Sequence, residues 1–128
     1  MLLLKSATVG VTTTGSAGSG AGNADSESFA GSIEGIAVNH DANAPATTDI
    51  TITDKRTGIT IWALNNSKTD VFVAPRVGAV TAANAAILAS EVNAIFAVPY
   101  CVDQGVSVAI AGGNAITNHV VVTVYYRK

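Results

Sequence analysis

The stretch that decides the fold covers residues 45–76 and has the sequence PATTDITITDKRTGITIWALNNSKTDVFVAPR, in which two polar turns separate three runs rich in β-branched residues. In the first run, 49–53, isoleucines alternate with polar residues, so a strand there places both isoleucines on one face. The segment 54–58 ends in Gly58, which tolerates a positive φ angle, and the next run covers 59–64. We therefore expect a β-hairpin with a loop of about five residues.

The second and third runs, 59–64 and 71–74, are apolar at both alternating sets of positions. Trp62 lies opposite a row of isoleucines in the second run, and Phe72 lies opposite two valines in the third. A strand that is apolar on both faces is expected to be covered on both sides. The cover could come from a second layer of the same chain or from a neighbouring subunit, and the sequence leaves both open.

Similar patterns recur along the rest of the chain. Further strands are expected at 7–14, 29–38, 95–100, 105–111 and 119–126. Within 29–38, apolar residues occupy both alternating sets, so the orientation of that strand stays open. Together these runs give about eight strands with short turns between them, which predicts one all-β domain over 1–128, a β-sandwich or jelly roll.

Two segments depart from the β pattern. Residues 15–23 are rich in glycine and serine, which predicts a flexible segment that acts as a mobile connector or a hairpin tip. Residues 80–93 are rich in alanine and have good helix propensity, but their apolar stripe is weak. We expect a short helix or an irregular crossover there.

The composition restricts the classes of partner. The chain has 128 residues, of which 12% are charged, about half the usual share, so its surface is poor in charge. Such a surface is more easily explained if partners cover part of it. A net charge of −2 argues against binding to nucleic acid, which requires a basic surface. No apolar run is long enough to cross a bilayer, so we expect no membrane partner.

Metal binding is the first chemistry that the sequence could suggest. His40 and Asp41 could be combined with Asp49 or Asp54 into a ligand set. The spacing of these residues matches no metal-binding motif, and each falls in an expected loop or turn or at a strand end. We therefore expect no metal site and no cofactor.

Nucleophilic catalysis is the second chemistry to consider. Cys101 is the only cysteine, so the chain has no intrachain disulfide. Cys101 and His119 would form a thiol–imidazole pair only if the fold brought them together, and no flanking signature supports such a pair. The sequence instead predicts Cys101 to be a small buried apolar residue, and it predicts no catalytic site. We therefore expect a protein that is not an enzyme.

Three aromatic residues are the main candidates for a functional surface. Trp62, Phe72 and Tyr125 each lie opposite the more aliphatic face of an expected strand. One interpretation is a core strand covered on both faces. The other is a set of anchors between subunits, because aromatic residues are enriched at buried interfaces.

Several of these segments carry a resemblance to a known family. They are TDITITD at 48–54, the Asn-Asn turn at 65–66, Ala-Pro-Arg at 74–76 and VVVTVYY at 120–126. Over residues 33–128 the chain resembles small structural proteins of tailed bacteriophages, in particular the capsid cement, or decoration, proteins.

The resemblance implies a role without catalysis. Such proteins sit as oligomers on the outer capsid surface of the virion, bind the major capsid protein and brace its capsomers. It implies assembly in the cytoplasm of the host bacterium, and the three-fold sites of an icosahedral shell make a trimer the first expectation. A tail or head-closure protein of a phage is an alternative. A carbohydrate-binding β-sandwich module is another, and it would require exposed aromatic residues over a polar groove.

Overall fold

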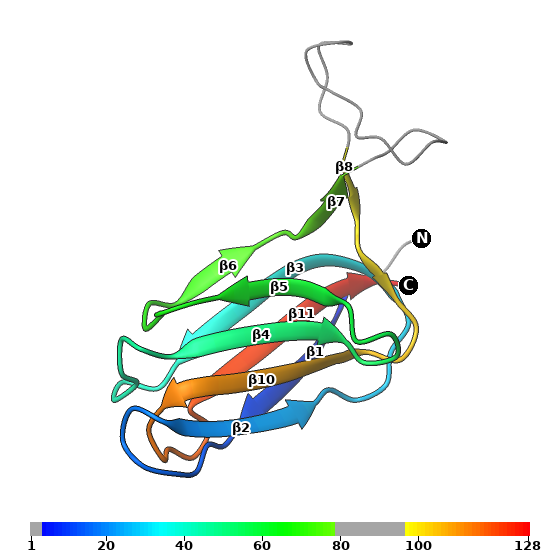
Figure 1. Ribbon diagram of the computed structural model, residues 1–128. Coiled ribbons are helices and arrows are strands. Elements are labelled where there is room, and N and C mark those ends of the chain that lie inside the picture. Colours follow the sequence, from blue (N-terminus) through cyan, green and yellow to red (C-terminus); the bar gives the residue numbers. More distant parts are fainter. Residues whose placement is uncertain (1–3, 79–96) are drawn as a thin grey trace, which may run out of the picture.

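The predicted all-β sandwich is confirmed by the computed structural model, which describes residues 4–78 and 97–128 (Figure 1). The described part of the chain contains strands and connecting segments and no helix. Its strands are β1 (Leu4–Val11), β2 (Gly20–Asp25), β3 (Gly31–His40), β4 (Asp49–Asp54), β5 (Thr60–Leu64), β6 (Val71–Val73), β7 (Arg76–Gly78), β8 (Ala97–Pro99), β9 (Cys101–Val102), β10 (Val106–Gly113) and β11 (Val120–Arg127).

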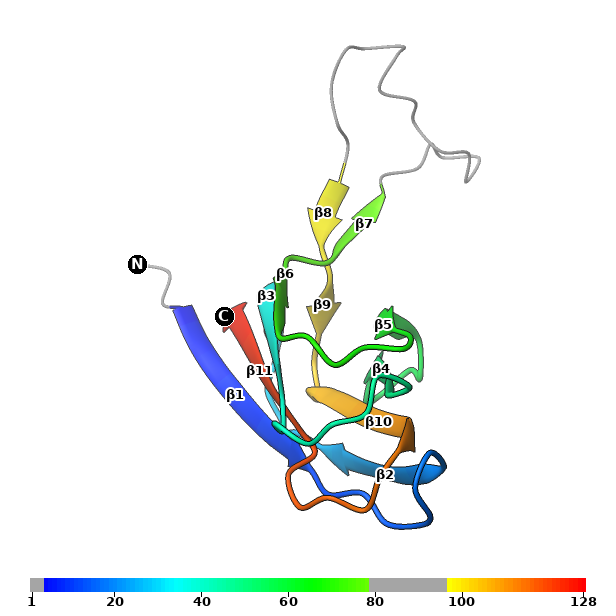
Figure 2. The ribbon, with the colours of Figure 1, turned by 90° about the vertical axis from the view of Figure 1, so that its left-hand side faces the viewer.

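Two antiparallel sheets form the layers of the sandwich, as Figure 2 shows from the side. Sheet I has the order β1-β11-β3-β6, and β9 also pairs with β3. Sheet II has the order β2-β10-β4-β5. Strands β7 and β8 form a separate two-stranded ribbon that projects from the sandwich. The strand order shows that β5 and β6 are edge strands of different sheets, although they follow each other in the chain.

The core lies between the two sheets and is built from the alternating strands that the sequence predicts. In β4 Ile50 and Ile52 are buried, and the polar residues that alternate with them, Asp49, Thr51 and Thr53, are half-buried on the other face. Strands β10 and β11 bury every second residue in the same way. Because burial of one such side chain stabilises the fold by about 1.5–3 kcal/mol, this double layer of Val and Ile is the main source of stability.

A β-bulge explains why the orientation of β3 was ambiguous in the sequence. Tyr125 pairs with Gly35, whereas Tyr126 pairs with Ile33, so Glu34 is an extra residue on β3. The bulge reverses the alternation, which allows Ile33 and Ile36 both to face the core with no exposed area. It also turns Glu34 to the outside of sheet I.

The predicted hairpin at 49–64 is confirmed as β4 and β5, which pair through a loop of residues 55–59. Gly58 in this loop has a φ angle of 75°, the left-handed conformation for which glycine is suited. After β5 the chain crosses to sheet I, where β6 pairs with β3. The crossover is held by the Asp70 carboxylate, which accepts a hydrogen bond from the backbone N–H of His40 at 2.7 Å.

Of the two kinds of cover that the sequence left open, cover of β6 on both faces by the same chain is not found among the described residues. Both β5 and β6 are edge strands, and Phe72 of β6 is 64% exposed. Apolar residues at alternating positions of a short edge strand do not require a second covering layer from the same chain. Cover by a neighbouring subunit stays a prediction.

Other details differ from the sequence-based expectation. The described residues form eleven strands rather than about eight: β2 lies partly in the segment expected to be flexible, and the short strands β7 and β9 were not expected. Residues 20–23 of the segment expected to be flexible lie in β2, which pairs with β10. The expected short helix or crossover at 80–93 lies outside the described residues. No described segment forms a helix long and apolar enough to cross a membrane.

Candidate interaction surface

The outward-facing positions of sheet I form the candidate surface, which we call face I. In each strand these positions alternate with the buried residues of the core. Face I consists of Leu4, Ser6, Thr8, Val121, Thr123, Tyr125, Gly35, Ala37, Asn39 and Phe72. None of these residues is charged, but two further outward-facing residues at one end of sheet I, Glu34 and Arg127, are charged and lie beside each other. The rest of the face can meet another surface without desolvating an ion.

An aromatic pair stands out on face I. The rings of Phe72 and Tyr125 lie 6.1 Å apart and are tilted by 52° to each other, within the range of favourable aromatic pairs. Leu4, which is 60% exposed, joins them around a pocket of about 250 Å³. Of the three large hydrophobic residues that are exposed in the described part of the chain, two therefore gather at one site.

Gly35 gives the aromatic pair its position. Gly35 lies on β3 between Tyr125 of β11 and the Phe72 side chain, and a Cβ atom there would collide with the Phe72 ring. The missing side chain lets the ring lie against the sheet backbone. Glycine in a strand often marks such a close approach, but the sequence alone did not say which side chain approaches.

Charged residues border the aromatic pair at one end of face I. Glu34 lies between two arginines, with the Arg76 Nη2 and Arg127 Nε atoms each 3.7 Å from a different oxygen of its carboxylate. Arg76 also donates a hydrogen bond to the carbonyl oxygen of Ile33 at 3.4 Å. The bulge on β3 turns Glu34 outward, and Arg76 reaches it from β7, immediately after β6. This end of the face therefore offers both donors and acceptors.

Trp62 lies apart from the other two predicted interface residues. It pairs with Ile52 across sheet II, and since Ile52 points into the core, Trp62 faces inward as well. It is half-buried and packs against the core from the edge strand β5. The structure therefore brings together Phe72 and Tyr125 and gives Trp62 a core position.

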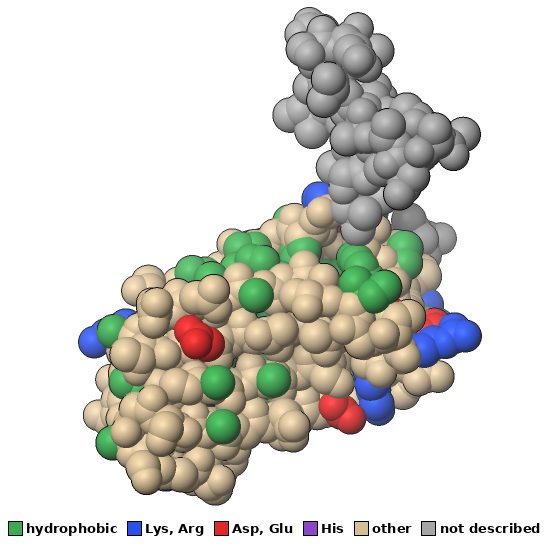
Figure 3. Space-filling view, in the orientation of Figure 1, with side chains coloured by type: hydrophobic (Ala, Val, Ile, Leu, Met, Phe, Trp, Pro, Cys, Tyr) green, Lys and Arg blue, Asp and Glu red, His purple; other side chains and the backbone are tan. Residues whose placement is uncertain are grey.

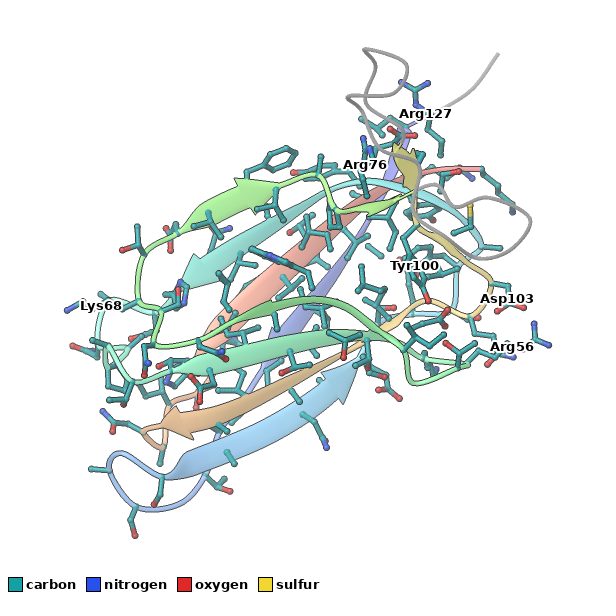
Figure 4. The ribbon with its side chains drawn as sticks, turned by 45° about the horizontal axis from the view of Figure 1, so that its top comes forward. Arg56, Lys68, Arg76, Tyr100, Asp103 and Arg127 are labelled. Atoms are coloured by element: carbon teal, nitrogen blue, oxygen red, sulfur yellow. The ribbon has the colours of Figure 1, made fainter. Side chains whose placement is uncertain are left out.

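A second pocket of about 250 Å³ opens beside β5. Its lining includes Ile59, which is 55% exposed, together with Arg76 and Tyr100. The Tyr100 hydroxyl, whose residue is labelled in Figure 4, donates a hydrogen bond to the Asp54 carboxylate at 3.4 Å. The polar groups at this pocket are therefore engaged with the protein itself.

The residues considered for catalysis are not brought together. Cys101 is exposed on β9, which corrects the prediction that it is buried, because the short strand β9 pairs at the end of β3 and is left uncovered. His119 is fully buried at the other end of the sandwich, next to β10, and burial lowers the pKa of its imidazole. Cys101 therefore has no nearby imidazole that could act as a base.

The residues considered as metal ligands are also separated. His40 lies 3.5 Å from Asp70, measured between Nδ1 and Oδ1, whereas Asp54 is at the far end of β4. Within residues 4–78 and 97–128, no group of three or more His, Cys, Asp and Glu side chains could hold a metal ion. The structure therefore does not bring the considered metal ligands together.

Comparisons with known proteins do not assign the chain to a family. No family model matches it, and no curated protein matches it. Among solved structures, it is similar to the carbohydrate-binding module CBM29-2 in complex with cellulohexaose, at 12% identity and a TM-score of 0.32, over 97% of this chain and 78% of that one.

A phage protein is among the other structural matches. The enzymatically active domain of tailspike protein 4 of bacteriophage CBA120 is 10% identical with a TM-score of 0.29, over 98% of this chain and 19% of that one. Likenesses at this level identify neither a relative nor a ligand. The function is therefore argued from the residues of face I.

Proposed function

We propose that this chain is a structural protein of a tailed-phage virion, a capsid decoration protein that binds the outer shell and has no enzymatic activity. Two observations support the proposal: the resemblance of residues 33–128 to that family, and the exposed aromatic pair on face I, most of whose residues are uncharged. The observation that carries most weight is Phe72, which is 64% exposed and lies beside Tyr125 and Leu4. Clustered apolar side chains on a surface poor in charge are typical of a protein–protein contact.

The energetic argument favours a partner that covers this cluster. Complete burial of a side chain such as that of Phe72 stabilises an association by about 1.5–3 kcal/mol. The exposed part of Phe72 is available to a partner, because its neighbours Gly35 and Ala37 are small. A decoration protein needs a rigid scaffold and surfaces for its neighbours, and the sandwich with face I provides both.

Binding to capsids tests the proposal. Purified capsids that lack this protein should bind it saturably, and the bound protein should raise the melting temperature of the shell. Phe72→Ser should weaken the binding at least tenfold, whereas Ile59→Ser, which removes a comparably exposed hydrophobic residue outside face I, should leave it unchanged. Failure of the wild-type protein to bind capsids at any concentration contradicts the proposal.

A second candidate function is carbohydrate binding at the same place. Aromatic rings stack on sugars, and charged groups beside them bind hydroxyl groups. Phe72 and Tyr125 lie beside Glu34 and its two arginines, which is the combination that such a site requires. Binding to a glycan array that is lost with Phe72→Ser would favour this function over capsid binding.

A further inference from the structure

We propose that face I is a self-association surface, on which a second copy of this chain packs across a two-fold axis with its strands antiparallel to those of the first. This inference rests on the proposed function and names a second copy as the occupant of face I in free solution, so the dimer must open before the same face can bind a capsid. It rests on the shape of the face, on the distribution of charge along it and on the size of the area.

The shape of face I suits a flat contact between two sheets. Apart from Leu4, Phe72 and Tyr125, its side chains are small or short, and the row that contains Phe72 continues through Ala37 and Thr123. A two-fold axis along this row places Phe72 of each copy against Phe72 of the other, Ala37 against Ala37, and Tyr125 over the short side chain of Val121. Aligned sheets packed in this way lie about 10 Å apart, which leaves room for one layer of interdigitated side chains.

The charges at the two ends of sheet I are complementary. The strands of this end, where β1 begins and β11 ends, carry Lys5, Arg76, Arg127 and Lys128 against Glu34, whereas Asp103, which follows β9, is paired with Arg56. At the opposite end, Asp41 and Asp70 outnumber Lys68. Figure 4 shows Arg76 and Arg127 at one end of the molecule and Lys68, in the loop that also carries Asp70, at the other.

This distribution determines the relative orientation of the two copies. A two-fold axis perpendicular to the strands places the cationic end of each copy against the anionic end of the other. A parallel arrangement would instead place like charges together, which is destabilising. Charge complementarity therefore favours the antiparallel pair, in which the same two contacts occur twice.

The area of face I sets the expected strength of the association. Strands β1 and β11 have eight residues each, β3 has ten, and β6 adds a short edge. At the usual spacing between strands and rise per residue, this face covers roughly 500 Å². Two copies then bury roughly 1,000 Å² in total, which is the lower limit for a specific interface, so we expect a dimer with a micromolar dissociation constant.

The first test is sedimentation equilibrium of the whole chain at concentrations from about 1 to 300 µM. Wild-type protein should show a monomer–dimer equilibrium. Phe72→Lys and the milder Phe72→Ser should weaken dimerisation at least tenfold. Ile59→Lys is the matched control, because Ile59 is exposed to a similar degree outside face I, and it should leave the dimer intact.

The second test locates the contact and does not depend on the folding of a Phe72 variant. In a Cys101→Ser background, Ala37→Cys on face I should give disulfide-linked dimers under mild oxidation. Ala109→Cys, at the middle of β10 on the outside of sheet II, should not. Crosslinking through Ala109→Cys with none through Ala37→Cys would overturn the inference.

The outcomes also separate this inference from the proposed function. Wild-type protein that is monomeric at every concentration, or that forms a trimer, overturns the two-fold pair, and its binding to capsids is then decided by the capsid experiment alone. A monomer that binds a glycan through Phe72 overturns it as well. A dimer lost with Phe72→Ser, together with Ala37→Cys crosslinking, supports it even if capsids are not bound.

Discussion

The outsides of the two sheets differ at the edge strand. On sheet I, one row across the strands runs Thr8, Thr123, Ala37, Phe72, and on sheet II the corresponding row runs Asn23, Ala109, Thr51, Ala63. The sheet II row contains no aromatic residue, whereas the sheet I row ends in an exposed Phe. The outside of sheet II, seen in Figure 3, shows scattered small apolar patches among polar surface.

The outside of sheet II also differs from that of sheet I in its polar side-chain contacts. The Ser107 hydroxyl donates a hydrogen bond to the Asp25 carboxylate at 2.6 Å, and the Lys55 ammonium lies 4.0 Å from the same carboxylate. The two sheets bury the same kinds of residue in the core, so their inner faces do not explain the contrast. The contrast lies in the outer faces, because sheet II carries polar side chains bonded to one another and sheet I carries an exposed aromatic pair.

The largest predicted effect concerns the buried side chains that both sheets contribute to the core. Ile36→Ala in sheet I and Ile52→Ala in sheet II should each lower the free energy of unfolding by about 2–5 kcal/mol, because both side chains are fully buried. Urea denaturation measures this. Thr123→Ala and Thr51→Ala, on the two outer faces, are the controls and should each change it by less than about 1 kcal/mol. If one of the two isoleucine variants left the free energy of unfolding nearly unchanged, the side chain of that sheet would not be part of the buried core.

The second prediction concerns the outside of sheet I, where the Phe72 ring lies against Gly35. Gly35→Ala should lower the free energy of unfolding by about 1–3 kcal/mol, because the added methyl group collides with the Phe72 ring. In the double variant with Phe72→Ala, the loss should be smaller than the sum of the single effects, since the ring is gone. Strict additivity in this double-mutant cycle would show that Phe72 does not lie against Gly35.

The third prediction concerns the buried end of the sandwich. Burial lowers the pKa of His119 below its ordinary value of 6.5, so the neutral imidazole is favoured in the folded state. The resulting stabilisation is complete above the unfolded-state pKa and is lost as the pH falls from about 6.5 through the folded-state pKa. The urea midpoint of wild-type protein should therefore fall between pH 7.5 and pH 5. His119→Gln should flatten this dependence, and an unchanged slope would contradict the assignment.

The sequence predicted the strands whose two faces differ in polarity. Strands β4, β10 and β11 alternate clearly, so their burial followed from period-two patterns, and Gly58 marked the hairpin loop. The strand β3 was ambiguous because a bulge at Glu34 interrupts its alternation, and a bulge depends on pairing with β11 rather than on local sequence.

The candidate surface was predicted only in part. The three aromatic residues were predicted as one set, whereas the structure places Phe72 beside Tyr125 outside the core and turns Trp62 inward. The pattern of apolar residues in 59–64 is the same for a covered strand and for an edge strand. Whether such a strand is covered or lies at an edge depends on the order of strands in the sheets. Here β5 is the edge strand of sheet II and β6 is the edge strand of sheet I, and local periodicity does not encode this order.

Hydroxyl-radical footprinting of Phe72, Tyr125 and Ile59 tests most directly the claim that face I is the binding surface. It should be performed on the protein at low concentration, at high concentration and on capsids. The account predicts that oxidation of Phe72 and Tyr125 falls in the associated states while oxidation of Ile59 stays constant. Unchanged oxidation of Phe72 and Tyr125 in every associated state, with protection of Ile59 instead, would contradict it.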